Sequence, residues 1–117
     1  MSVLQELTSA LSALGAPLET GVFTDKPPDE YIVITPMTEW AAVSGDNWPV
    51  IDVAEFRITL YTRKNYVRRK NQIIRACLDN GFTITMRRYV GFEESTGYHT
   101  YAVDAAKEFF TEVELDG

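Results

Sequence analysis

Residues 54–62 read AEFRITLYT, and this stretch decides the fold. Phe56, Ile58 and Leu60 fall on one side of an extended chain, and polar or amphipathic residues alternate with them. An apolar alternation of period two is typical of a β-strand that buries one face and exposes the other. The stretch therefore predicts a half-buried strand.

The alternation changes phase just before this strand. Ile51 and Val53 are apolar, but they fall on the face opposite to Phe56. A shift by one residue turns every side chain of a strand to the other face. The change predicts a bulge, or a strand end that leaves the core and offers Ile51 and Val53 to a partner.

The preceding residues, 36–50, mix turn formers with large aromatic side chains. The segment is too long for a tight hairpin turn, so we expect an extended hairpin arm. It contains Trp40, Trp48 and Pro49. Because Trp is enriched at protein interfaces and connecting segments often carry binding, these residues are candidates for a protein interface. The alternative is that both indole rings fold back over the core.

Leucines at helical spacing predict a first helix over about residues 3–14. Ser2 followed by Gln5 resembles a capping box, and Gly15 and Pro17 end the segment. Three turns are too few for a coiled coil, so the leucine face is expected to pack onto a sheet.

A second helix is predicted after Asn65, which can cap it, and Asn80 and Gly81 end it. One face of this helix is apolar and is expected to be buried. Its members are Tyr66, Val67, Ile73, Ile74, Cys77 and Leu78.

Further strands are expected at residues 18–23, at 31–35, from Phe82 onward and through Tyr101 and Val103, with a turn near residues 93–97 before the last. Prolines make residues 25–29 a loop. The order of elements predicts one α+β domain over residues 1–117. Its antiparallel sheet of four to five strands carries both helices on one face and extends into the hairpin arm.

Charge excludes a general nucleic-acid binder, because 11 Lys and Arg against 17 Asp and Glu give a net charge of −6, which phosphate repels. Basic residues nevertheless cluster between residues 63 and 75, where Arg68 and Arg75 project together from the second helix. This face is either an ordinary solvated surface or a docking site for an acidic surface such as Glu93 and Glu94.

Candidates for chemistry are few. Cys77 is the only cysteine and His99 the only histidine, and a Cys on an apolar helix face is typical of a core thiol. Glu93, Glu94 and His99 lie near one another in sequence, but turn and register roles explain that stretch. We therefore expect no catalytic residues, no cofactor and no metal. The apolar runs are too short to cross a membrane and no signal peptide is evident, so synthesis in the cytoplasm is expected.

The order of three short segments resembles a known family. These are residues 61–66 (YTRKNY), residues 80–82 (NGF) and residues 93–99 (EESTGYH). Over about residues 30–105 the chain resembles the tail terminator, or tail-to-head joining, proteins of long-tailed phages and prophages. Residues 105–113 do not match that pattern.

The resemblance implies a structural protein of the virion and not an enzyme. Such proteins form a six-membered ring that caps the finished tail tube and docks it to the head connector. The partners it implies are further copies of the chain, the tail tube protein and a connector or stopper protein, without direct reading of nucleic acid and without a membrane. Another neck or tail-completion component is the first alternative, and a small ligand-binding regulator or enzyme with a deep polar pocket around His99 is the second.

Overall fold

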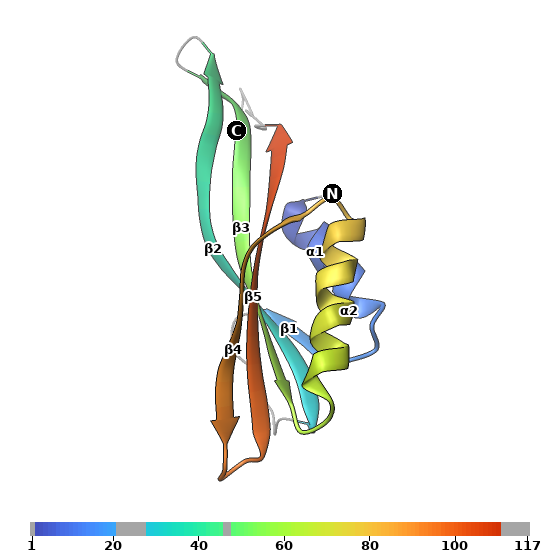
Figure 1. The fold of residues 1–117 in the computed structure, drawn as a ribbon. Coiled ribbons are helices and arrows are strands. Elements are labelled where there is room, and N and C mark those ends of the chain that lie inside the picture. The colour runs from blue at the N-terminus through green and yellow to red at the C-terminus, as the bar shows by residue number, and fades with distance from the viewer. Residues whose placement is uncertain (1, 21–27, 46–47, 111–117) are drawn as a thin grey trace.

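The computed structural model describes the backbone of residues 2–20, 28–45 and 48–110, and the side chains of all of these except residues 20, 43–45 and 48–50. In chain order the elements are α1 (Val3–Ser12), β1 (Leu18–Thr20), β2 (Glu30–Gly45), β3 (Trp48–Thr62), α2 (Tyr66–Asp79), β4 (Thr83–Glu93) and β5 (Tyr98–Phe110). The five strands form one sheet in the order β1-β2-β3-β5-β4. Both helices lie on one face of this sheet (Figure 1). The predicted α+β fold is confirmed.

One feature of the sheet departs from the prediction. The pairs β2–β3, β3–β5 and β5–β4 are antiparallel. Strand β1, however, pairs parallel with β2, from Leu18 opposite Ile32 to Thr20 opposite Ile34. Residues 21–29 separate these two strands, a connection longer than a hairpin turn. The sheet is therefore mixed at this edge, and it is antiparallel elsewhere.

The helix boundaries follow from their capping residues. At the start of α1, the Ser2 backbone N–H donates to Gln5 Oε1 at 2.9 Å and the Gln5 N–H donates to Ser2 Oγ at 3.1 Å, which confirms the capping box. At α2, Asn65 Oδ1 accepts from the Arg68 N–H at 3.2 Å. This helix ends at Asn80 and Gly81, where Gly81 has a φ of 82°. The first helix is slightly shorter than predicted and ends at Ser12.

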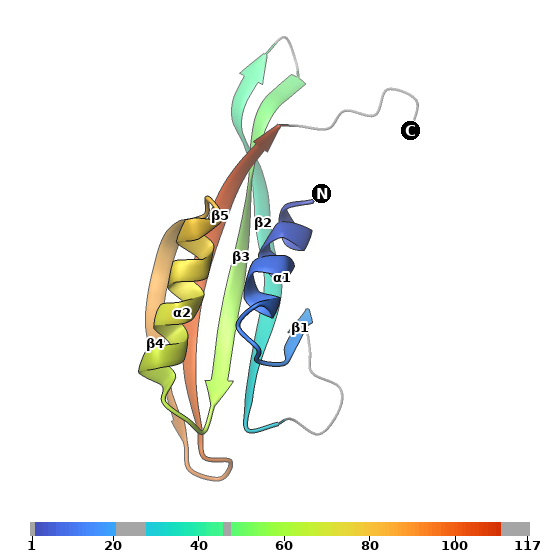
Figure 2. The same cartoon turned by 90° about the vertical axis from the view of Figure 1, so that its right-hand side faces the viewer.

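The core lies between the helices and the sheet (Figure 2). Leu7, Leu11 and Cys77 of the helices are fully buried. They pack in one cluster with Ile58, Leu60 and Val103 of the strands, among others. The prediction that Phe56, Ile58 and Leu60 face the core is confirmed, as are the buried strand around residues 31–34 and the core position of Cys77.

The buried face of α2 is narrower than the sequence predicts. Val67 and Leu78 are 45% and 52% exposed, so their assignment to the buried face is wrong. At about 100° per residue, both lie roughly a quarter turn around the helix from Cys77. Both lie on the same side of the helix, just beyond Ile74, and therefore at the margin of the buried stripe.

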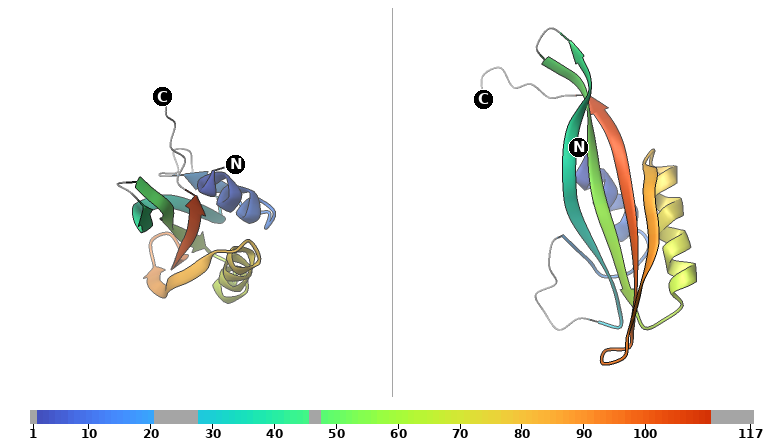
Figure 3. Two further views of the ribbon diagram at one scale, coloured as in Figure 1. Left: turned by 90° about the horizontal axis from the view of Figure 1, so that it is seen from above. Right: turned by 60° about the vertical axis from the view of Figure 1, so that its left-hand side comes forward.

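The molecule is elongated, with extents of 54 × 25 × 23 Å. Its length comes from β2 and β3, which continue as a twisted ribbon past the ends of the helices (Figure 3). Within the described residues, no helix has both the length and the apolar character to cross a membrane.

Candidate assembly interface

A hairpin projects from the sheet past the ends of the helices (Figure 3). We call residues 35–45 of β2 and 48–53 of β3 the arm. Within the arm the two strands pair from Trp40 opposite Val53 to Gly45 opposite Trp48, and residues 35–39 pair with residues 54–57 of β3. Every side chain from Thr35 to Ala42 is exposed. The predicted extended hairpin arm is thus a paired β-ribbon, with shifts of register along β2.

Bulges are present near the predicted phase change, but they lie in β2 and not in β3. The register with β3 shifts between Pro36 and Thr38, and again between Ala41 and Ser44. The pairing of β3 with β5 is uninterrupted from Ile51 onward. An extra residue in one strand re-aims the side chains that follow it. The bulges therefore allow Trp40 to lie directly opposite Val53.

The predicted interface residues of the arm differ in exposure. Trp40 is 45% exposed, and Met37 beside it is similarly exposed. Ile51 is half-buried, and Val53 is buried, so the side chain of Val53 contributes little to the surface of the single chain. Trp48 and Pro49 begin β3, but their side chains lie outside the described residues.

The outer edge of β2 is open along the arm. Strand β1 covers only Ile32 to Ile34 of β2. In the part of the chain that the structure describes, no strand pairs with the outer edge of β2 from Thr35 to Gly45. An open strand edge presents free N–H and C=O groups that can pair with another chain.

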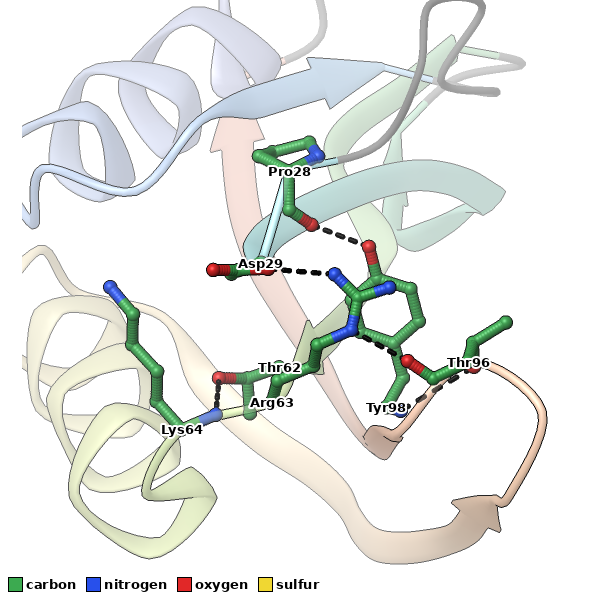
Figure 4. A network of polar contacts seen from close by, with 7 residues as sticks. All are labelled: Pro28, Asp29, Thr62, Arg63, Lys64, Thr96 and Tyr98. Carbon is green, nitrogen blue, oxygen red and sulfur yellow. Dashed lines mark hydrogen bonds and ion pairs between the residues drawn. The ribbon is translucent and has the colours of Figure 1, made fainter.

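The opposite end of the molecule is, in contrast, tied together by polar contacts (Figure 4). Arg63 forms an ion pair with Asp29 at 2.7 Å, donates to the Thr96 carbonyl at 2.6 Å and lies over the ring of Tyr98 at 4.2 Å. The Tyr98 hydroxyl donates to the Pro28 carbonyl. These contacts join the start of β2, the end of β3 and the β4–β5 turn.

A buried ion pair lies near that end. Glu30 is 7% exposed and pairs with Arg69 at 2.8 Å, while the Thr62 hydroxyl donates to its other oxygen at 2.9 Å. Arg69 also donates to the Leu14 carbonyl at 2.7 Å. A buried carboxylate needs such partners, since its desolvation is otherwise costly. The contacts therefore fix α2 to β2 and to the end of the α1 segment.

The predicted basic face is present on α2. Arg68 and Arg75 are both exposed and line one open groove of about 730 Å³ between α1 and α2. Arg75 forms an exposed ion pair with Asp79 at 3.4 Å. Glu93 and Glu94 lie at the β4–β5 turn, where the Gly97 N–H donates to the Glu93 carbonyl at 2.7 Å. The predicted turn is confirmed, and a contact of Glu93 and Glu94 with the basic face stays a prediction about two copies.

The sequence prediction missed a second exposed region, at β4. Eight large hydrophobic side chains are exposed among the described residues, and three of them, Tyr89, Val90 and Phe92, belong to β4. The alternation that starts at Phe82 breaks at residues 87–92 (RRYVGF), where the register with β5 shifts between Tyr89 and Gly91. This break in the alternation is the sequence feature that indicates the exposed region at β4.

The candidates for chemistry lie in apolar or aromatic surroundings. Burial raises the pKa of the Cys77 thiol to about 12, so the reactive thiolate is disfavoured at neutral pH. His99 lies between Phe92 and Tyr66, with ring centroids at 4.8 and 5.3 Å, and its Nδ1 is 2.9 Å from the Tyr89 hydroxyl. Among the described residues, no group of three or more His, Cys, Asp or Glu side chains is placed to hold a metal ion.

Comparison with known proteins gives similarity of structure but not of sequence family. No protein-family model matches the chain, and no curated protein matches it. Among solved structures, a chain of the structure titled "Virion of native gene transfer agent (GTA) particle" is similar, with a TM-score of 0.59 and 13% sequence identity. The match covers 94% of this chain and 92% of that chain. The likeness therefore extends over nearly the whole fold of both chains.

Proposed function

We propose that this protein is a structural component of a phage-like virion, and specifically a tail terminator. In this role copies of the chain form a ring, expected to have six members, that caps the tail tube and joins it to a connector or stopper protein of the head. The protein would be made in the host cytoplasm and end in the tail or neck of the particle.

The fold supports this proposal. The similar chain belongs to a virion, and the match spans both chains almost completely. The order and spacing of three short segments, at residues 61–66, 80–82 and 93–99, also resemble those of tail terminators. A structural role also accounts for a buried, unreactive Cys77 and for a His99 held among aromatic rings. We accordingly propose that the chain has no catalytic activity.

The exposed arm is the observation that carries the proposal. A hairpin with an open edge and exposed Met37 and Trp40 is costly for an isolated protein, because it invites pairing with other chains. A second exposed region lies at β4, across the sheet from β2. Two different surfaces that bind each other produce head-to-tail contacts, and these close into a ring when the rotation between copies closes.

Tube growth in vitro tests the proposed role. The purified chain is added to tail tubes that are polymerising from the matching tube protein, and the tubes are measured by electron microscopy. We expect shorter tubes that carry a ring at one end. Trp40→Ala, which removes the exposed anchor of the arm, is the matched variant and should leave tube length less affected. Tubes of unchanged length without a terminal ring would contradict the proposal.

A further inference from the structure

The sheet has two free edges, and they run in opposite directions. Strand β2 is antiparallel to β3, β3 to β5, and β5 to β4. Three reversals make β2 antiparallel to β4. When two copies lie side by side with their strands in a common direction, β4 of one copy therefore meets β2 of the next in the antiparallel sense, which is the more stable form of pairing.

Both edges are available for such pairing. In the described residues β4 pairs with β5 alone, so its outer edge is open from Thr83 to Glu93. The arm is open from Thr35 to Gly45 on the outer side of β2. Each edge also carries exposed apolar side chains: Met37 and Trp40 on the arm, and Tyr89, Val90 and Phe92 on β4.

The two edges carry opposite charges. From Thr35 to Gly45 the open strand of the arm has one charged residue, Glu39. On β4, Arg87 and Arg88 are adjacent and exposed. Among the described residues neither arginine takes part in an ion pair, and neither does Glu39 of the arm. Charges without partners within the chain are complementary between the edges of two copies.

The faces of the sheet also match. Residues directly opposite each other in an antiparallel pair point to the same face. Glu39 is opposite Ala54, and Arg87 is opposite Val103, and both of these partners belong to the core under the helices. Glu39 and Arg87 thus lie on the helix side of the sheet. Trp40 and Arg88 lie on the other side.

We propose that the arm of one copy pairs with the β4 edge of a second copy of this chain, and that the sheet continues from copy to copy. On the helix side Glu39 faces Arg87. On the other side the indole of Trp40 packs against the guanidinium of Arg88, an arrangement that attracts a cation to an aromatic ring. This inference rests on the proposed ring, because it names the contact between its members.

A charge exchange tests the contact. Glu39→Arg and Arg87→Glu each place like charges at the contact and are expected to weaken self-association by about 10-fold or more, because like-charge contacts suppress pairing. In the double variant Glu39→Arg/Arg87→Glu every contact is complementary again and the net charge is that of the parent. Association of the double variant should return to within about threefold of the parent, as a coupled pair requires.

Mixing the two single variants provides a second readout. Copies that alternate around a ring have only complementary contacts, so the mixture should assemble where each variant alone does not. Circular dichroism and thermal unfolding check that each variant is folded, which is expected because both positions are exposed.

The outcomes separate the contact from the proposed function. A parent chain that assembles while both single variants assemble equally well overturns the contact and leaves the ring intact. The same holds when the single variants fail but neither the double variant nor the mixture recovers. A parent chain that stays monomeric at every concentration, alone and at tube ends, overturns both.

Discussion

The β2–β3 hairpin is built differently at its two ends. At the helix-covered end, Ile32, Ile34, Ile58 and Leu60 are almost completely buried. In the arm, β2 carries exposed side chains from Thr35 to Ala42, Trp40 among them, while Ile51 of β3 is half-buried and Val53 is buried. Both ends contain large apolar residues, so composition does not separate them. The difference shows that the helix-covered end of the ribbon belongs to the main core, whereas β2 in the arm keeps large apolar side chains exposed.

Truncation of one side chain at each end of the hairpin is expected to give the largest difference in the free energy of unfolding. Ile58→Ala leaves a cavity in the core and is expected to lower the free energy of unfolding by about 2–5 kcal/mol. Met37→Ala in the arm is expected to change it by less than about 0.5 kcal/mol, because exposed side chains away from special features contribute little. Urea denaturation of both variants measures the difference. Equal losses would mean that the arm is part of the core in the isolated chain.

Trp40→Ala, also in the arm, is expected to affect self-association strongly and stability little. Removal of an aromatic anchor at an interface typically costs about 2 kcal/mol or more, so self-association should weaken by roughly 30-fold. The thermal unfolding transition of the monomer should remain cooperative and close to that of the parent. Loss of that transition, with association unchanged, would place Trp40 in the core.

Hydrogen exchange sharpens the comparison without a substitution. In a monomeric sample, backbone amides of Thr38 to Ala42 are expected to exchange well before those of Phe56 to Leu60, since few buried contacts hold the arm. On assembly, protection of the arm should rise and that of Phe56 to Leu60 should change little. Equal protection of both segments in a proven monomer would count against the arm as an interface.

The basic face of α2 is expected to give the smallest effect. Arg68→Glu/Arg75→Glu should weaken association less than Arg87→Glu and change monomer stability by only about 1 kcal/mol, as for exposed charges generally. Raising the salt concentration should reproduce part of this weakening of association in the parent chain. If the double variant associates like the parent at low ionic strength, the face is simply solvated.

Much of the fold is predictable because local rules decide it. The alternation of Phe56, Ile58 and Leu60 gave the central strand, and Ser2 with Gln5 gave the start of α1. The parallel pairing of β1 was not predictable, because it depends on where a connection returns the chain and not on local pattern. The exposure of Val67 and Leu78 was not predictable, because both lie at the margin of the apolar face of α2, where the sequence pattern does not separate buried from exposed positions.

The candidate site was predictable in part. Trp40 was a candidate because Trp is enriched at protein interfaces, and it is exposed. Val53 is buried by its neighbours in the sheet, which no local pattern shows. The β4 edge was missed because its role follows from strand order. Only the order β1-β2-β3-β5-β4 shows that Arg87, Arg88 and Tyr89 lie at an outer edge of the sheet.

The oligomeric state of the parent chain tests the central claim most directly. Its mass is measured by sedimentation velocity over the widest concentration range that solubility allows, and again after incubation with tail tube ends. We predict that monomers convert into one closed species of defined mass, without larger aggregates, because head-to-tail contacts that close leave no free edge. A chain that stays monomeric under both conditions, or that grows into open polymers, would contradict a ring built on the arm.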